Sequence, residues 1–178
     1  MPPSREPGLP IGHVAIRPLG RDDLDLMRGL LGDPAMTAHL GGPQSRDQIE
    51  ETFNDLLSDD APGGAFAITL GDDPRGVGWL GYWETQIHGA AAWEIGLSVL
   101  PAWQGHGIGS RALRVGLDRA ADERRHRFVH AFVGLDNAAS ERMCVRVGLE
   151  RIGEEDVEYP PGRWSRCSEW RIALWPED

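Results

Sequence analysis

The sequence contains no lysine, so all 18 of its basic residues are arginines; they stand against 28 acidic residues and give a formal net charge of −10. The absence of lysine excludes Schiff-base chemistry on a lysine, and it excludes a P-loop, whose motif ends in GK[ST]. The acidic balance disfavours binding to duplex DNA or RNA, because contacts to phosphate dominate the affinity of such proteins. We therefore expect no nucleic-acid partner.

Cysteines and long apolar runs are also scarce. The only cysteines, Cys144 and Cys167, cannot form a CxxC motif, and the six histidines form no HExxH motif, so we expect no metal. No apolar run approaches the about 20 residues of a membrane helix, and the first ten residues hold four prolines and no signal-peptide pattern. We expect no membrane association, a cytoplasmic location, a flexible leader over 1–12 and a single domain over 13–178.

The spacing of apolar residues predicts an α/β domain. Alternating or continuous apolar segments predict strands at 11–19, 66–70, 77–87, 92–100, 128–135, 150–159 and 164–175. Apolar residues at helical spacing predict three helices: one after Asp22 and Asp23, one after a capping-box pattern at Ser45 and Gln48, and one over 110–124. A fourth helix opens at Asn137 and closes at Gly148. The resulting order, β-α-α-β-β-β-α-β-α-β-β, is typical of a layered domain with a mixed sheet.

The segment from Gln104 to Gly109 (QGHGIG) joins the strand that ends at Pro101 to the helix that starts near Ser110. Its glycines let the backbone approach a ligand closely, and the following helix N-terminus favours an anion such as a pyrophosphate. Six arginines and three acidic residues between 111 and 127 give that stretch a net charge of +3, which suggests a polyanionic cofactor. Tight packing alone is an equally good explanation of such a loop. The spacing GxGxG differs from the GxGxxG of a Rossmann fold.

Two segments carry a family resemblance. The segment from Leu97 to Gly109 (LSVLPAWQGHGIG) resembles the acetyl-CoA motif of GNAT N-acetyltransferases, whose core is [QR]-x-x-G-x-[GA]. Asn137-Ala138-Ala139-Ser140, followed by Gly148-Leu149, resembles the second motif of that family. The resemblance implies a three-layer domain with a mixed, mostly antiparallel twisted sheet flanked by about four helices. Within the family, Arg17-Pro18-Leu19 and the sequence WQGHGIGSRAL around the glycine loop most resemble the RimJ/RimL branch.

The resemblance also implies an activity and a set of contacts. Acetyl-CoA would be the acetyl donor, and a primary amine of a small molecule or a protein N-terminus would be the acceptor; homodimers are common in the family. The strands at 92–100 and 128–135 would splay apart to admit the pantetheine arm. The residues that the resemblance assigns to the cofactor are Leu97, Ser98 and Val99 for the pantetheine, Gln104, Gly105, His106, Gly107, Ile108, Gly109 and Ser110 for the pyrophosphate loop, and Asn137 near the thioester.

Glu94 is the first candidate for a general base. In a strand over 92–100 it shares one face with Gly96 and Ser98, and Gly96 leaves space for a substrate. A solvated carboxylate is an equally good explanation. Glu84 is the second choice, and Trp83 and Glu84 are candidate substrate-binding residues. Further candidate walls of the acceptor pocket are His88, Glu158, Tyr159 and Trp164.

Cys144 lies seven residues after Asn137, on the same face of the expected helix. Many GNAT members carry at this position a tyrosine that protonates the leaving thiolate, and a cysteine could do the same or could simply be a buried apolar residue. We favour the second interpretation. Two other classes stay open: an acyl-CoA-binding module without catalysis, whose cysteine replaced the tyrosine, and a nucleotide-binding protein.

Overall fold

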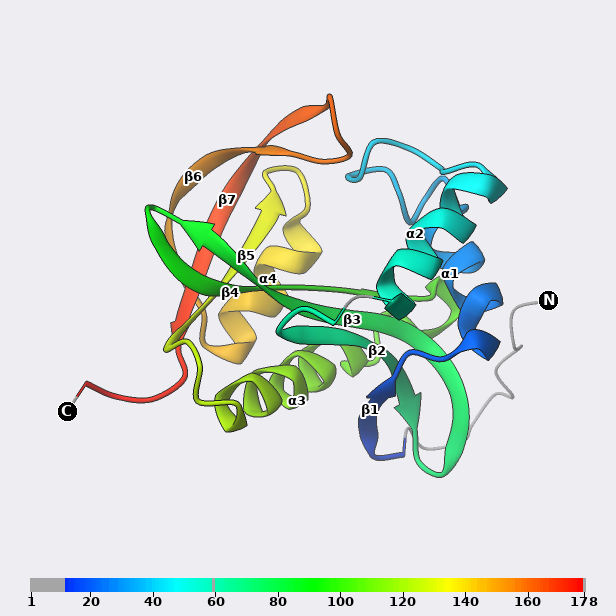
Figure 1. The fold of residues 1–178 in the computed structure, drawn as a ribbon, viewed down its shortest axis with the longest axis horizontal. Helices are drawn as coiled ribbons and strands as arrows, with labels where there is room; N and C mark the ends of the chain where they lie inside the picture. The colour runs from blue at the N-terminus through cyan, green and yellow to red at the C-terminus, as the bar shows by residue number, and fades with distance from the viewer. Residues whose placement is uncertain (1–11, 59, 178) are drawn as a thin grey trace.

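A computed structural model describes residues 12–58 and 60–177 of the chain. Eleven of the twelve residues of the expected leader lie outside these ranges, so the leader stays a prediction, as does the single domain. The described segments fold as four α-helices and seven strands in the predicted order (Figure 1). The strands are β1 (Val14–Pro18), β2 (Gly63–Leu70), β3 (Asp73–Ile87), β4 (Ala90–Val99), β5 (Phe128–Gly134), β6 (Glu150–Glu158) and β7 (Trp164–Ala173).

The strands form one sheet in the order β1-β2-β3-β4-β5-β7-β6. Every neighbouring pair is antiparallel except β4 and β5, which are parallel and are joined through a helical crossover. The predicted class, a mixed and mostly antiparallel sheet with about four helices, is confirmed.

Helices cover both faces of this sheet. The helices α1 (Leu24–Leu31) and α2 (Arg46–Ser58) cover one face, and α3 (Ile108–Asp122) and α4 (Ala138–Val147) cover the other (Figure 1). The alternation of β2 shows how one strand serves both layers: Phe66 and Ile68 belong to the core under α3, whereas Ala67 belongs to the core under α1 and α2. No helix of the described residues is long and apolar enough to cross a membrane.

Local sequence signals set several boundaries. The capping box of α2 forms as predicted: Ser45 N–H donates to Gln48 Oε1, and Gln48 N–H donates to Ser45 Oγ. Gly148 ends α4 with a φ of +98°, which is the expected left-handed cap. The helix α3 begins at Ile108, two residues earlier than the spacing predicts, because Gly107 adopts a φ of +74° and serves as its N-cap.

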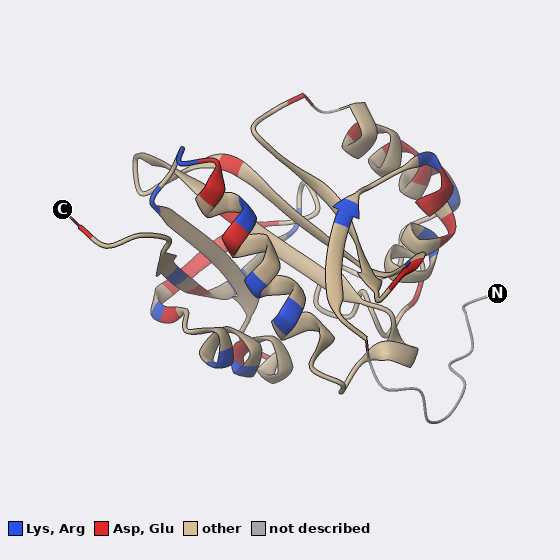
Figure 2. Cartoon of the chain, turned by 90° about the horizontal axis from the view of Figure 1, so that it is seen from below, with Lys and Arg blue, Asp and Glu red and all other residues tan. Residues whose placement is uncertain are grey.

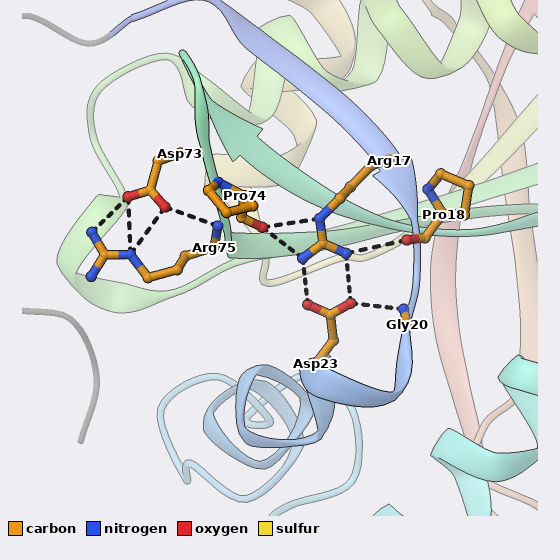
Figure 3. Close-up of polar contacts among 7 residues, drawn as sticks. All are labelled: Arg17, Pro18, Gly20, Asp23, Asp73, Pro74 and Arg75. Carbon is orange, nitrogen blue, oxygen red and sulfur yellow. Dashed lines mark hydrogen bonds and ion pairs between the residues drawn. The ribbon is translucent and has the colours of Figure 1, made fainter.

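An ion pair between the half-buried Arg17 and the buried Asp23 fixes the first strand to the helical turn that precedes α1 (Figure 3). Both Arg17 terminal nitrogens donate to the Asp23 carboxylate at 2.7 Å, and Arg17 Nε and Nη2 also donate to the carbonyl oxygen of Pro74. Gly20 N–H donates to the same carboxylate at 2.8 Å. Burial raises the pKa of Asp23, but the hydrogen bonds from Arg17 and Gly20 outweigh it and lower the pKa overall. The pair therefore stays charged at neutral pH.

Candidate functional site

The strands β4 and β5 separate soon after they meet. Their ladder consists of two pairs, Trp93 with Val129 and Glu94 with His130. On its other edge, β4 pairs with β3 as far as Val99, so Leu97, Ser98 and Val99 bond to β3 and face no β5 partner. The predicted separation of these strands is confirmed. An unpaired strand edge exposes backbone N–H and C=O groups that an amide-containing chain can bond.

The glycine loop lies at the end of this gap. Gly105 and Gly107 adopt φ values of +75° and +74°, and nothing lies within 4 Å of the position where either would carry a Cβ. The first bond of the α3 ladder runs from Arg111 N–H to Gly107 O, so the N–H groups of Ile108, Gly109 and Ser110 precede the ladder. Since the Ile108 and Ser110 side chains are buried, these two residues can offer a ligand only their backbone. Such an arrangement suits a phosphate group.

Two polar side chains of the loop bond to nearby protein atoms. Gln104 Nε2 donates to the carbonyl oxygen of Val99 at 2.9 Å and contacts the Met36 sulfur at 3.1 Å. His106 Nδ1 lies 3.3 Å from the carbonyl oxygen of Trp103. These contacts tie the loop to the end of β4, so the Gln104 side chain positions the loop.

The arginines of α3 do not gather at the loop as the sequence suggested. The helix has 15 residues and is about 22 Å long, and Arg124, Arg125 and Arg127 lie beyond its far end. Arg124 lies over the Trp175 ring, and Arg125 pairs with Glu84. Figure 2, which views the molecule from below, shows basic and acidic segments interspersed on this side. Only Arg111 and Arg114 lie in the first two turns of α3, so the local charge of +3 is spread along the helix.

The connection between α1 and α2 joins three other parts of the chain. Beside the Met36 contact with Gln104, His39 Nδ1 lies 2.9 Å from Asp136 Oδ1, and Gly41 O accepts a bond from Arg163 Nη1 at 3.1 Å. Asp136 precedes Asn137, whose Oδ1 accepts from Ser140 N–H and caps α4. The connection thus runs past the glycine loop, the start of α4 and the β6–β7 turn.

Glu94 lies at the closed end of the gap between β4 and β5. It is half-buried and has no ion-pair partner among the described residues. Burial raises the pKa of Glu94, and the Trp83 side chain offsets this only in part. Trp79 and Trp83 rings lie against Gly96, at 3.8 and 3.6 Å from the position of a Cβ, so indoles line the space expected there. A carboxylate with a raised pKa can accept a proton near neutral pH.

The structure separates Trp83 from Glu84. Trp83 pairs with Glu94 across the ladder and shares its face, whereas Glu84 pairs with Trp93 and points to the opposite face. There Glu84 Oε2 bonds to Arg125 and His126, and these bonds lower its pKa. Glu84 is therefore not brought together with Glu94, and a second base at this position has no support in the geometry.

Cys144 lies in the core under α3 and α4, with 1% of its surface exposed. Burial raises the pKa of its thiol to about 11. The placement supports the interpretation of Cys144 as a small buried apolar residue. Cys167 is also buried.

The β6–β7 turn carries exposed aromatic residues. Trp164 is 65% exposed and Tyr159 is 43% exposed, while Glu158 Oε1 accepts a bond from Gly162 N–H. These side chains lie on the arm that reaches toward the α1–α2 connection (Figure 1). A hollow of about 1240 Å³ lies elsewhere, between β1, α1, the start of β3 and residues 101–103; neither Glu94 nor Gly105–Ser110 lines it.

Sequence reasoning missed a buried carboxylate, Glu169 on β7, which is 2% exposed. Its oxygens accept bonds from His130 Nδ1 at 2.7 Å and lie 2.9 and 3.0 Å from His88 Nε2. His88, Glu155 and Glu169 place one oxygen or nitrogen each within 4.8 Å of one another, but hydrogen bonds to imidazole already account for the Glu169 oxygens. The signal that the sequence offered was weak, because Glu169 is one of five polar or charged residues in the ten of this strand.

Together these features define a class: an α/β domain with a glycine loop and a helix N-terminus at a gap in its sheet, and a carboxylate of raised pKa at the closed end of that gap. A sequence-family model, the acetyltransferase (GNAT) domain, matches residues 13–150. The chain therefore belongs to the GNAT acetyltransferase family.

Solved structures agree on the fold. An acetyltransferase (GNAT family) from Bacillus anthracis has a TM-score of 0.76 and 18% identity, over 93% of this chain and 97% of that one. The spermidine N-acetyltransferase from Vibrio cholerae, in complex with CoA and spermine, has a TM-score of 0.75 and 20% identity, over 91% and 96%. RimJ from Mycobacterium smegmatis, in complex with CoA-disulfide, has a TM-score of 0.73 and 24% identity, over 91% and 82%. These values do not single out the RimJ/RimL branch.

Proposed function

We propose that this protein transfers an acetyl group from acetyl-CoA directly to a primary amine of a small molecule or of a protein N-terminus. The observation that carries the proposal is the gap between β4 and β5, with the glycine loop at its end and Glu94 at its closed end. Two observations support the cofactor: residues 97–109 resemble the acetyl-CoA motif of the family, and two structures of the same fold, the spermidine N-acetyltransferase and RimJ, are complexes with CoA and CoA-disulfide. A place in the RimJ/RimL branch, a cytoplasmic location and a homodimer stay predictions.

The geometry offers a place for each part of the donor. The N–H groups of Ile108, Gly109 and Ser110 would hold the pyrophosphate, and the free edge of Leu97, Ser98 and Val99 would bond the pantetheine amides. Asn137, at the start of α4, would lie near the thioester, which supplies the activated acetyl group. Nothing in this donor set calls for a metal.

Glu94 has the task of removing a proton from the acceptor. The neutral amine attacks the thioester, but an alkyl ammonium group has a pKa of about 10.4. Deprotonating it at pH 7 therefore costs about 4–5 kcal/mol of free energy. A positioned base recovers part of that cost, and burial raises the pKa of Glu94 toward the working pH. The face that Glu94 shares with Trp83 and Gly96 would receive the acceptor.

The cofactor can be tested by the thermal stability of the protein with acetyl-CoA, CoA, ATP or NAD. A ligand at 100 times its dissociation constant should stabilise the fold by about 2.7 kcal/mol, or raise the melting temperature by about 5–10 °C. Gly107→Glu should abolish the shift by placing a negative charge in the loop. Gly71→Glu is the matched control, because Gly71 also has a positive φ of +56° with open space around it, at the β2–β3 turn.

Turnover is then measured by thiol release with spermine and with a short peptide that has a free N-terminus. Stabilisation by acetyl-CoA and CoA together with thiol release would support the proposal. Binding without turnover over a broad amine panel would favour the acyl-CoA-binding module, and preference for ATP or NAD would favour a nucleotide-binding protein.

A further inference from the structure

The candidate is the cluster of His130, Glu169 and His88, which lies beside Glu94 and has no part in the function proposed above. His130 is the ladder partner of Glu94 in the second and last pair of the β4–β5 ladder. Partners in a ladder share a face, and neighbouring strands lie about 4.8 Å apart. A group that enters the gap from the open end therefore meets both Glu94 and His130 where the gap closes.

Glu169 fixes the orientation of His130. The distance from His130 Nδ1 to Glu169 Oε1 is 2.7 Å, and both side chains are at least 94% buried. Because a carboxylate can only accept, His130 donates through Nδ1, and its Nε2 is left with a lone pair. A carboxylate that holds an imidazole in this tautomer is the arrangement that prepares histidine as a base in hydrolytic triads.

His88 connects the cluster to solvent. It lies in the turn between β3 and β4, with a φ of +51°, and its Nε2 lies 2.9 Å from Glu169 Oε2. Its side chain is 54% exposed, against 2% for that of Glu169. The three residues thus form a continuous hydrogen-bonded chain from the closed end of the gap to the surface.

We propose that His130 is a second proton acceptor of the transfer reaction, that Glu169 positions it, and that the chain through Glu169 to His88 carries the proton to solvent. This inference rests on the function proposed above. It concerns the residues that handle protons, and the acetyl donor and the acceptor class are unchanged.

The transfer removes two protons from the acceptor nitrogen. An acceptor ammonium group loses two protons as its C–N bond forms and the C–S bond of the thioester breaks. One proton ends on the departing thiol, and the other must reach solvent. Glu94 can take the first proton, the one that frees the amine. Glu94 then gives its proton to the departing thiolate. His130 Nε2 takes the second proton as its Nδ1 proton passes to Glu169 and then to Nε2 of a neutral His88, which releases a proton from Nδ1 to solvent.

The surrounding charges are consistent with this role. The titratable or charged groups that face His130 are Glu94 on β4, Glu169 and Arg171 on β7, and His88 in the β3–β4 turn. Glu155 on β6 faces His88. Burial lowers the pKa of His130, against the opposite effect of Glu169, so His130 is neutral and able to accept a proton at neutral pH. The hydrogen bond to Glu169 raises the pKa of His88.

The test compares His130→Ala, His130→Gln and Glu169→Gln with the wild type in thiol release with spermine or the peptide, from pH 6 to 10. We expect His130→Ala to lower kcat by about 100-fold or more at pH 7 and the deficit to persist toward pH 10, because the second proton leaves the nitrogen only as the C–N bond forms, whereas the deficit of Glu94→Gln should shrink as the free amine becomes abundant. Added imidazole should restore part of the rate of His130→Ala. Glu169→Gln should lower kcat by about tenfold and should not respond to imidazole.

Each variant is first checked for its melting temperature and for stabilisation by acetyl-CoA, and His130→Gln serves where His130→Ala fails to fold. His13→Ala, an exposed histidine before β1, is the control for loss of a histidine and should keep the wild-type rate. An active wild type whose His130 variants keep its rate and pH profile would overturn the inference alone. A wild type that neither binds acetyl-CoA nor releases thiol would overturn the proposed function as well. Activity that EDTA abolishes and Zn²⁺ restores would assign the cluster to a metal and overturn the proton chain.

Discussion

The molecule buries two carboxylates that have different partners. Asp23 is 4% exposed and is held by an arginine, while Glu169 is 2% exposed and is held by two histidines. Arginine stays protonated at any pH that a folded protein meets, so the pair of Arg17 and Asp23 is a fixed connection between β1, the N-cap of α1 and the start of β3. Imidazole gains or loses a proton near neutral pH, so the cluster around Glu169 can change its charge.

Glu94 adds a third case to this comparison. It is half-buried and has no cationic partner in the part of the chain that the structure describes, and its pKa is raised where that of Asp23 is lowered. The pKa of a carboxyl group in this fold therefore follows its partner more than its burial. The difference separates a carboxylate that stabilises the fold from two that lie at the candidate site.

The largest effect is expected from breaking the fixed pair. Asp23→Ala removes the only anionic acceptor of the Arg17 guanidinium among the described residues and the acceptor of Gly20 N–H, and it leaves Arg17 with carbonyl oxygens alone. We expect it to lower the free energy of unfolding by about 3 kcal/mol. Urea unfolding measures this loss, and thiol release per folded molecule should stay within about threefold of the wild type. A change of less than about 0.5 kcal/mol would show that the pair stabilises nothing.

Removing the charge of Glu94 should affect catalysis and leave stability nearly unchanged. We expect Glu94→Gln to lower kcat about 100-fold at pH 7, because a base contributes about that much, and to leave stabilisation by acetyl-CoA intact. The measurement is thiol release against pH. Glu51→Gln, at an exposed position of α2, is the control. An unchanged kcat would assign proton removal to water or to His130.

Cys144→Ala tests a buried group that, unlike the carboxylates, stays neutral at pH 7. Its thiol has a pKa of about 11, so we expect loss of packing, about 1 kcal/mol of unfolding free energy, and a fall in turnover of a few-fold at most. Urea unfolding and thiol release are measured on the same sample. A loss of turnover of several thousandfold would make Cys144 the acid for the thiolate.

The smallest effect is expected from His88→Gln, and its sign depends on pH. Since the folded-state pKa of His88 is raised, its contribution to stability is fully present below about pH 6.5 and is lost as the pH rises through the folded-state value. Urea unfolding should thus show His88→Gln weaker than wild type at pH 5.5 and closer to it at pH 9. A deficit that grows with pH would contradict the charged pair with Glu169.

Much of the fold was predictable because its signals are local. The capping box at Ser45, the left-handed cap at Gly148 and the alternation of β2 each depend on a few neighbouring residues. The glycine loop could be recognised for the same reason, since its conformation requires glycine where φ is positive.

The order of the elements, the glycine loop and the face that carries Glu94 follow from local sequence patterns. The opposite orientation of Glu84 and the spread of the arginines away from the loop are visible only in the folded chain. The fold also brings His130 to Glu94, and Glu169 to His88 across 81 positions of the chain. Periodicity assigns a residue to a face, but the partners on that face come from distant segments, and sheet order and register decide which of them meet.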